Sequence, residues 1–228
     1  MTRDKENLIV FDWNGTLLAD TTACLRAMNT VLKALGSPPI TRAQYQKHYA
    51  MPLDKLYYGV GVTPEVLRTN EKIIHSIWHE VYSSAPIRMR RGAKKMLHTV
   101  RKTPCTSIVL SNYIEDRIKE QAERFGVRQH FDDVIAFRVG DATFRTSGKS
   151  GRLKKYLQNR PAREGIIIGD TQEEIEIGRD LGMVTIAITD GMCSTSRLRA
   201  MKPDFMVCAL EQVPPIVSNV FGGKKGRS

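Results

Sequence analysis

Acidic and polar side chains follow three separate apolar runs of this 228-residue chain. Asp12 interrupts the run that begins LIVF, Ser111 and Asn112 follow TSIVL, and Asp170 follows GIIIG. A carboxylate at such a position can act as a nucleophile or bind a metal ion. Two carboxylates in one site repel each other unless a cation lies between them. The sequence therefore predicts that Asp12 and Asp170 share a hard cation such as Mg²⁺.

The elements that position these side chains follow an alternating pattern. Runs rich in Val and Ile are followed by segments of helical periodicity, as in TSIVLSN before YIEDRIKEQAERFGV and GIIIGD before TQEEIEIGRDLG. VTIAIT, HFDDVIAF and DFMVCAL are expected to add strands. This alternation predicts an α/β fold with a doubly wound parallel sheet. Because the ligand crevice of such a sheet lies outside the carboxyl ends of its strands, the polar sites are expected to converge there.

A long interval without a strand pattern separates the first strand from TSIVLSN. Four segments in it have helical patterns: TACLRAMNTVLKALG, TRAQYQKHYA, LDKLYYGVG and TPEVLRTNEKIIHSIWHEVYSS. We therefore expect a core domain formed by residues 1–17 and 88–221, a helical cap at 18–87, and a flexible basic tail at 222–228. The histidines of the last segment, His75 and His79, are expected to pack or lie at the surface with Trp78, since no third metal ligand is nearby.

Composition indicates an ordinary globular protein, with 41% hydrophobic and 26% charged residues. No apolar run approaches the ~18 residues needed to span a bilayer, and the few apolar residues before Asp12 are too short for a signal peptide. The four cysteines lie far apart without a CxxC pair. Free thiols in a reducing compartment are the expectation, so we predict a soluble cytoplasmic monomer or homodimer without membrane contact.

Positive charge is concentrated in the later part of the chain. The net charge is +11; residues 1–87 hold 9 Lys or Arg against 8 Asp or Glu, whereas residues 88–228 hold 26 against 16. Two clusters, RMRRGAKKMLHTVRK and GKSGRLKKYLQNRPAR, could attract a polyanion. No aromatic-rich platform for single strands accompanies them, so solvated helix faces are favoured. Nucleic acid is therefore possible but not favoured as a partner.

Four segments together resemble the motifs of the haloacid dehalogenase (HAD) superfamily. FDWNGTLL resembles the first motif, DxDGT; LSN resembles the second; Lys149 fits the third; and GDTQEE resembles the fourth, GDxxxD, with Glu174 in its last position. The order is the same and the match covers nearly the whole chain. The resemblance implies a Rossmann-like core with a helical cap inserted after the first motif, and it is closest to the phosphoglycolate phosphatase branch.

The resemblance also implies a role for each matching residue. Asp12 would attack phosphorus and form an aspartyl-phosphate. The implied catalytic residues are Asp12, Asn14, Ser111 and Lys149. The implied phosphate-binding residues are Gly15 and Thr16, through backbone N–H groups, with Ser111, Asn112 and Lys149. The implied Mg²⁺ ligands are Asp12, the backbone carbonyl of Asn14, Asp170 and, directly or through water, Glu174.

The third motif departs from the family pattern because no proline follows its lysine. Lys154 and Lys155 lie nearby and compete for the role. Lys149 is preferred because it precedes the helical segment that carries Leu153 and Leu157, which places it in a loop near the strand ends.

Asn14 is a second departure, since HAD phosphatases have an aspartate there that protonates the leaving group and activates water. An amide has no proton to exchange near neutral pH, and lost acid–base help costs ~10²–10⁴ in rate. Three alternatives stay open: a phosphatase that is slow or acts on a good leaving group, a phosphonate-cleaving enzyme with Lys47 or Lys55 as its Schiff-base lysine, or a binding protein for phosphorylated ligands or nucleic acid. Asn14 and Asp170 argue against dehalogenation. We expect a Mg²⁺-dependent phosphatase-like hydrolase.

Overall fold

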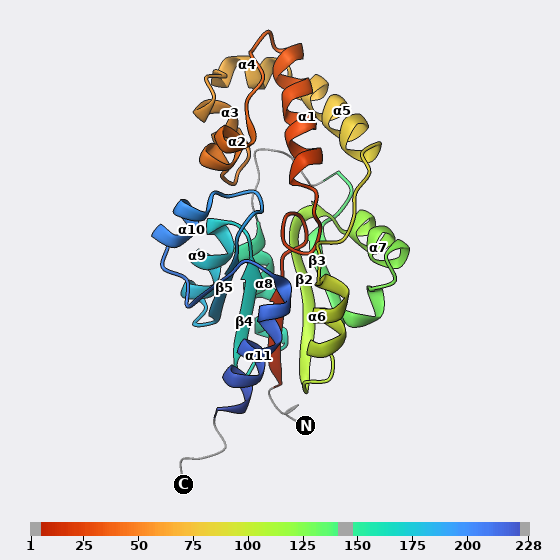
Figure 1. Cartoon of the computed structure of the whole chain (residues 1–228). Coiled ribbons are helices and arrows are strands. Elements are labelled where there is room, and N and C mark those ends of the chain that lie inside the picture. The colour runs from red at the N-terminus through yellow and green to blue at the C-terminus, as the bar shows by residue number, and fades with distance from the viewer. Residues whose placement is uncertain (1–5, 141–147, 224–228) are drawn as a thin grey trace.

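The computed structural model describes residues 6–140 and 148–223 (Figure 1). The predicted basic tail at 222–228 falls largely outside these residues. Its first residue, Gly222, is the last residue of a helix, and Gly223 follows it directly. Residues 224–228 lie outside the described part of the chain, so the predicted flexibility of the tail stays a prediction.

Six parallel strands form one sheet in the order β3-β2-β1-β4-β5-β6. The strands are β1 (Asn7–Phe11), β2 (Cys105–Ile114), β3 (Asp133–Phe137), β4 (Gly165–Gly169), β5 (Val184–Ile188) and β6 (Phe205–Val207). The predicted α/β fold with a doubly wound parallel sheet is confirmed. Phe11 pairs with Val109 of β2 and with Ile168 of β4. This register brings the residues that follow Phe11, Leu110 and Gly169 to the same edge of the sheet.

Helices cover both faces of the sheet, which explains why its strands are continuously apolar. Ile9 and Phe11 pack on one face with residues of α6 (Ala93–Val100), α7 (Glu115–Arg124) and α11 (Val213–Gly222). Leu8 and Val10 alternate with them and pack on the other face with α8 (Lys149–Asn159) and α9 (Gln172–Asp180). The remaining helices of the core are α10 (Thr195–Ala200) and the 3₁₀ turns η1 (Arg128–His130) and η2 (Leu210–Gln212). None of the helices in the described ranges has the length and apolar character of a membrane span.

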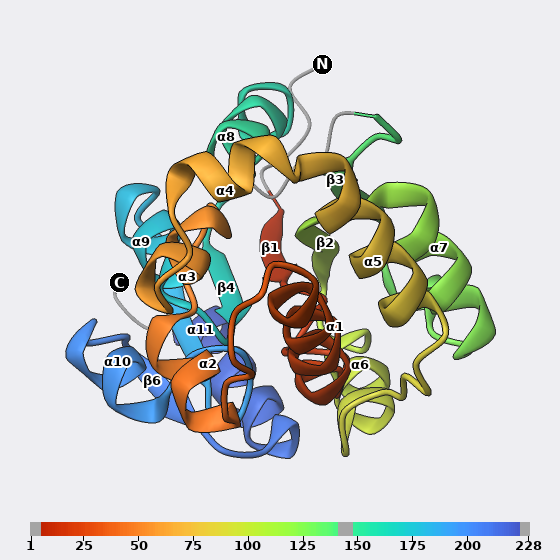
Figure 2. The ribbon, with the colours of Figure 1, turned by 90° about the horizontal axis from the view of Figure 1, so that it is seen from above.

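Of the six helices between β1 and β2, the first five stand over the carboxyl edge of the sheet (Figures 1 and 2). They are α1 (Thr21–Ala34), α2 (Arg42–His48), α3 (Asp54–Gly59), α4 (Pro64–Thr69) and α5 (Glu71–Ser83). They enclose a hydrophobic cluster of their own, which includes Met28, Leu56 and Ile74. The chain enters and leaves this lobe through two adjacent segments, because Ala19 N donates to Arg88 O at 2.9 Å. The proposed domain limits at 17–18 and 87–88 fall at this crossing.

Two predicted elements differ from the structure. The long helix expected from TPEVLRTNEKIIHSIWHEVYSS is interrupted at Asn70, whose backbone leaves the helical conformation and whose side chain donates to Val66 O at 2.9 Å. Such bonding competes with the backbone for a helical carbonyl. Strand β2 continues to Ile114 with a register shift after Leu110, so α7 begins at Glu115, two residues later than expected. The bulge re-aims the end of β2, where Ser111 lies.

Candidate active site

Asp12 lies at the carboxyl end of β1 and is 4% exposed. Lys149 Nζ donates to Asp12 Oδ1 at 2.6 Å. The hydroxyl of Thr16 lies 3.1 Å from Asp12 Oδ2 and donates to Asp170 Oδ1 at 2.7 Å. Asp170 Oδ2 also accepts from the backbone N–H of Met192 at 2.5 Å. The sheet therefore brings the two predicted carboxylates together around one threonine hydroxyl.

Burial disfavours the ionised form of both carboxyl groups. Burial raises the pKa of Asp12 to about 7, with a further rise from Asp170, although Lys149 acts in the opposite direction. Burial and the neighbouring Glu174 raise the pKa of Asp170 to about 6. Thr16 has a single hydroxyl proton, so it cannot donate fully to both carboxylates. A proton or a cation between them would relieve this repulsion.

The arrangement fits Mg²⁺ in the chemistry of its donors. Mg²⁺ prefers oxygen ligands and usually keeps waters and substrate oxygens beside one or two carboxylates. Asp12 and Asp170 provide those carboxylates, and the backbone carbonyl of Asn14 follows in the same loop. Within the described ranges no group of three or more His, Cys, Asp or Glu side chains is arranged to hold a metal ion. The fit therefore rests on two side chains and leaves the other positions to water and substrate.

Glu174 has protein donors on its carboxylate group, and its predicted role at the metal, directly or through water, stays a prediction. Lys149 Nζ donates to one of its carboxylate oxygens, and the Thr171 hydroxyl donates to the other at 2.6 Å. Thr171 and Glu174 also form the capping box that begins α9. Both oxygens of Glu174 are thus engaged by protein donors. Glu174 lies beside Lys149 and holds its ammonium group in place.

Lys149 is the first residue of α8 and is buried, with 4% of its surface exposed. Burial alone would lower the pKa of its amine, but the carboxylates of Asp12 and Glu174 raise it above the ordinary value. The amine is therefore a permanent cation between two acids. Lys154 and Lys155, the competitors within the same helix, are exposed. The preference for Lys149 agrees with this geometry, although the residue begins the helix and does not lie in the preceding loop.

The turn after β1 requires glycine at position 15. Gly15 has φ +77°, and a Cβ there would lie 2.3 Å from Asp170 Oδ2. Its backbone N–H donates to Asp20 Oδ1 at 2.7 Å, so the structure gives the predicted phosphate donor an acceptor within the protein. The Thr16 hydroxyl likewise faces the two carboxylates. The predicted phosphate contacts of the Gly15 and Thr16 backbones stay predictions.

Asn14 belongs to a network that the sequence analysis did not include. Its Nδ2 donates to Asp20 Oδ2 at 2.6 Å and to the Tyr82 hydroxyl at 2.8 Å, and that hydroxyl donates to Asp20 Oδ2 at 2.6 Å. Burial raises the pKa of Asp20. Asp20 precedes α1 in the N-cap position, yet its side chain makes no cap bond and faces the turn instead. An acid immediately before a helical pattern is usually assigned to capping. The contact of Asp20 with Asn14 is therefore not evident from the sequence.

Ser111 and Asn112 lie together at the bulge of β2. Ser111 is buried, and its Oγ accepts from Tyr113 N at 3.1 Å. Asn112 Nδ2 donates to Glu173 Oε2 at 2.7 Å, while Arg152 donates to Asn112 Oδ1 at 3.0 Å. Asn112 therefore connects β2 with α8 and α9, and its predicted phosphate contact stays a prediction. Glu173 and Arg152, which the sequence analysis did not select, hold this corner of the site.

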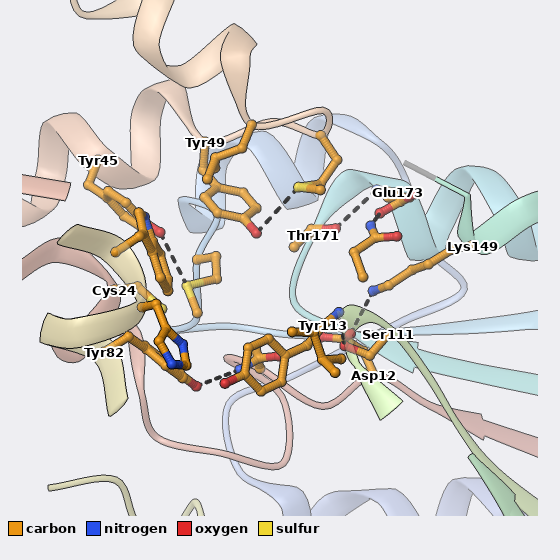
Figure 3. A pocket seen from close by; sticks show the side chains of 18 of the residues that line it. Asp12, Cys24, Tyr45, Tyr49, Tyr82, Ser111, Tyr113, Lys149, Thr171 and Glu173 are labelled. Atoms are coloured by element: carbon orange, nitrogen blue, oxygen red, sulfur yellow. Dashed lines mark hydrogen bonds and ion pairs between the residues drawn. The ribbon is translucent and has the colours of Figure 1, made fainter. Parts of the chain in front are cut away.

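A cavity of about 240 Å³ opens between the cap and the carboxyl edge of the sheet (Figure 3). Asp12, Asn14, Ser111 and Lys149 reach its wall from the core. Residues of α5 form part of the opposite wall: Ile74, His75, Trp78, His79 and Tyr82. Their spacing places them on one helix face. Packing or a surface position was expected for His75, Trp78 and His79, whereas their helical spacing indicates that they share one wall.

The two lysines considered for Schiff-base chemistry do not reach this cavity. Lys47 and Lys55 are both exposed. Among the described residues that line the cavity, Lys149 is the single lysine, and no arginine is present. Its amine is already bound by Asp12 and Glu174. The arrangement gives a phosphonate-cleaving reaction no free amine of the kind it requires.

Three features define a capped hydrolase core. They are the parallel sheet covered by helices, the buried Asp–Lys pair at its carboxyl edge, and the helices inserted after the first strand. Residues 9–188 match the family model described as haloacid dehalogenase-like hydrolase. The chain belongs to this family. The predicted assignment to the HAD superfamily and to the hydrolases is thereby confirmed.

Relatives of known sequence or structure cover nearly the whole chain. A phosphoglycolate phosphatase of Vibrio vulnificus (strain YJ016) is 21% identical over 227 residues, which are 95% of this chain and 98% of that protein. A phosphoglycolate phosphatase of Synechococcus elongatus is 22% identical over 206 residues, 87% of this chain and 91% of that protein. A haloacid dehalogenase-like hydrolase from Streptococcus pneumoniae superposes with a TM-score of 0.76 at 18% identity and covers 92% of this chain and 97% of that one. The similarity to the phosphoglycolate phosphatase branch is confirmed at low identity.

Proposed function

We propose that this protein is a Mg²⁺-dependent phosphatase that acts on a small phosphate ester through an aspartyl-phosphate at Asp12. The observation that carries the proposal is the 2.6 Å bond from Lys149 Nζ to Asp12 Oδ1 at the wall of the cavity. The contact with a cation orients the buried carboxylate for attack, and with a pKa of about 7 a substantial share of Asp12 is ionised near neutral pH. The phosphatase relatives support the same reaction class.

The residues of the chain account for the first step. Asp12 attacks phosphorus, while Lys149 and Ser111 offset the charge on the transferring phosphoryl oxygens. Mg²⁺, held by Asp12, Asp170 and the Asn14 carbonyl, supplies further charge stabilisation when bound. The leaving oxygen departs with the electron pair of its bond to phosphorus. Glu174 keeps the lysine in position through its own ion pair.

The second step hydrolyses the aspartyl-phosphate with water. In this chain the residue that would accept the proton of that water is the amide Asn14, which can orient water but cannot take its proton. Turnover is therefore slow for substrates that need acid–base help.

Two other functions receive less support. The position of Lys47 and Lys55 outside the cavity disfavours phosphonate cleavage. The basic residues of α6 and α8 are largely exposed on helix faces, as solvated faces are, which disfavours a dedicated nucleic-acid site. The four free cysteines support a cytoplasmic location. We propose a small phosphorylated metabolite as the ligand and a monomer or homodimer as the assembly.

A comparison of wild type with Asp12→Asn tests the proposal. Both proteins are assayed for phosphate release from a panel of small phosphate esters, with Mg²⁺ and with EDTA. We expect activity that requires Mg²⁺ and falls to background in Asp12→Asn. Activity that survives this substitution, or no release from any ester, would overturn the proposed function.

A further inference from the structure

The cavity wall opposite the catalytic residues is aromatic. Four aromatic rings of the cap besides histidine line it: Tyr45, Tyr49, Trp78 and Tyr82. Tyr113 of β2 adds a fifth ring to the cavity from the core side, beside Ser111. Figure 3 shows the four labelled tyrosines around the same cavity as Asp12, Ser111 and Lys149. Aliphatic and sulfur-containing side chains of the cap fill the spaces between them. A wall of this composition binds apolar and flat groups.

The hydroxyls of the three cap tyrosines are engaged by groups of the protein. The hydroxyl of Tyr45 donates to Met192 Sδ at 3.7 Å, and that of Tyr49 donates to Met51 Sδ at 3.8 Å. The hydroxyl of Tyr82 donates to Asp20. Their hydrogen-bonding groups are thus used inside the protein, and the ring surfaces remain to contact a ligand. Dispersion and ring packing therefore dominate recognition on this side.

The charge of the wall does not suit a substrate with a second anionic group. Lys149 is the single lysine among the described lining residues, no arginine joins it, and its amine is bound by two carboxylates. His75 and His79 can each donate a ring N–H, but they add aromatic surface too. A carboxylate beside the phosphate, as in phosphoglycolate, would enter a mainly apolar wall. Among the described lining residues it would find no lysine or arginine besides Lys149, so its burial there would be costly.

Size and leaving-group chemistry point in the same direction. A cavity of about 150 Å³ is large enough to bind benzene, and this cavity has about 240 Å³. A phenol has a pKa of about 10, as tyrosine does. An aliphatic alcohol is close to water, at about 15.7. A phenolate therefore leaves without a proton, and Asn14 cannot provide one.

We propose that the substrate is an aromatic phosphate monoester, whose ring lies against the aromatic wall and whose phosphate faces Asp12. This inference rests on the proposed phosphatase function and names its substrate class. In the first step a bond forms between a carboxylate oxygen of Asp12 and phosphorus. The bond between phosphorus and the phenolic oxygen breaks, and its electron pair leaves with the phenolate. Water then displaces Asp12 from phosphorus and yields inorganic phosphate, while its proton passes to solvent.

Three phosphate monoesters and one acyl phosphate separate ring recognition from leaving-group chemistry. The monoesters are phenyl phosphate, benzyl phosphate and phosphoglycolate, and the acyl phosphate is acetyl phosphate. Benzyl phosphate has the ring but an alkoxide leaving group. We expect kcat/KM for phenyl phosphate to exceed that for benzyl phosphate by ~10²–10⁴, the usual worth of acid–base help. Benzyl phosphate should nevertheless inhibit phenyl phosphate hydrolysis competitively, and phosphoglycolate should not. Faster hydrolysis of phosphoglycolate than of phenyl phosphate, or no competition by benzyl phosphate, would overturn the inference.

Acetyl phosphate distinguishes failure of this inference from failure of the proposed function, because it has a good leaving group and no ring. Hydrolysis of acetyl phosphate that depends on Asp12, without hydrolysis of phenyl phosphate, would overturn the substrate class alone. No hydrolysis of any of the four compounds would overturn both.

Substitutions on α5 test the wall directly. Trp78→Leu should lower the ratio of kcat/KM for 1-naphthyl phosphate to that for acetyl phosphate by ~10-fold, while Trp78→Phe should retain most of the ratio. Ile73→Ala is the matched control, since Ile73 is on the same helix, 52% exposed and outside the cavity lining. Thermal melts verify that each variant is folded. An unchanged ratio in a folded Trp78→Leu protein would contradict the aromatic wall as the recognition element.

Discussion

The side-chain amide of Asn14 donates a 2.6 Å hydrogen bond to Oδ2 of Asp20. The same carboxylate accepts from Tyr82 and, through its other oxygen, from Gly15 N. Because a carboxylate only accepts hydrogen bonds, the amide must present its nitrogen to Asp20. Asp20, the acid in contact with Asn14, is thus buried behind it and is not among the residues that line the cavity.

Asn14→Asp should restore an acid at the cavity wall. The new carboxyl group would lie beside the buried Asp20, and like charges at this distance keep one proton between them at neutral pH. We expect hydrolysis of alkyl phosphates to rise by ~10²–10⁴ and that of p-nitrophenyl phosphate to rise much less, since its leaving group is stable as an anion. The ratio of the two rates in wild type and variant is the measurement. An unchanged ratio with inert alkyl substrates would show that Asn14 is not a missing acid.

The double exchange Asn14→Asp with Asp20→Asn is the matched control for this experiment. It keeps one carboxylate and one amide in the network, so the buried charge stays the same. We expect Asn14→Asp alone to lower the melting temperature, because two buried acids share one site. The exchange should recover most of that loss. Equal melting temperatures for the single variant and wild type would contradict the close approach of positions 14 and 20.

Lys149→Ala should remove the cation that holds Asp12. We expect kcat/KM to fall by at least ~10²-fold, because lost electrostatic stabilisation at a reacting group typically costs ~10²–10³. Lys154→Ala on the same helix is exposed and should keep wild-type rates. Steady-state kinetics with p-nitrophenyl phosphate compare the three proteins. Equal losses in both variants would assign the effect to α8 and not to the Lys149 amine.

Asp170→Ala should weaken Mg²⁺ binding. Asp170 and Asp12 face the same threonine hydroxyl, so removal of one leaves a single carboxylate for the ion. Titration calorimetry on both proteins measures the change, with Asp180→Ala as a control acid near the end of α9, where it is exposed. Equal Mg²⁺ affinity in wild type and Asp170→Ala would refute the assignment.

Stability in EDTA should fall as the pH rises from 5 to 8. Burial raises the pKa of Asp12 to about 7 and that of Asp170 to about 6, so between pH 4 and 7 the folded protein binds more protons than the unfolded chain. The folded state then loses stability as these protons leave. Mg²⁺ should raise the melting temperature more at pH 8 than at pH 5, because it competes with protons for the same oxygens. A Mg²⁺ effect that is independent of pH would contradict this competition.

Nucleic-acid binding should be absent at moderate salt. The net charge of +11 permits weak attraction at low salt, and released counterions make such binding fall steeply as salt rises. Gel-shift assays with DNA and RNA at 50 and 200 mM salt, conditions under which this dependence is large, provide the measurement. A complex that survives the higher salt would favour a dedicated nucleic-acid site over the small-ligand function.

Several features could be predicted because they depend on neighbouring residues. Apolar runs with polar ends located β1, β2 and β4, and the order of those strands in a parallel sheet implied that Asp12, Ser111 and Asp170 converge. Lys149 could be selected although no proline follows it, as one does in the family motif. The interruption at Asn70 and the bulge after Leu110 were missed, since both arise where side-chain bonds or pairing override local propensity.

The sequence by itself determined the fold class, the family and the acids at the strand ends, because strand and helix periodicity and short motifs are local properties. Tertiary structure alone decided which donors each acid receives. Lys149 forms ion pairs with both Asp12 and Glu174, two residues that lie far from each other along the chain. Asp20 turns from its helix to Asn14 and Tyr82, and one face of α5 becomes the wall of a cavity. These contacts depend on how the cap folds over the sheet. They join residues far apart in the sequence, so local patterns cannot predict them.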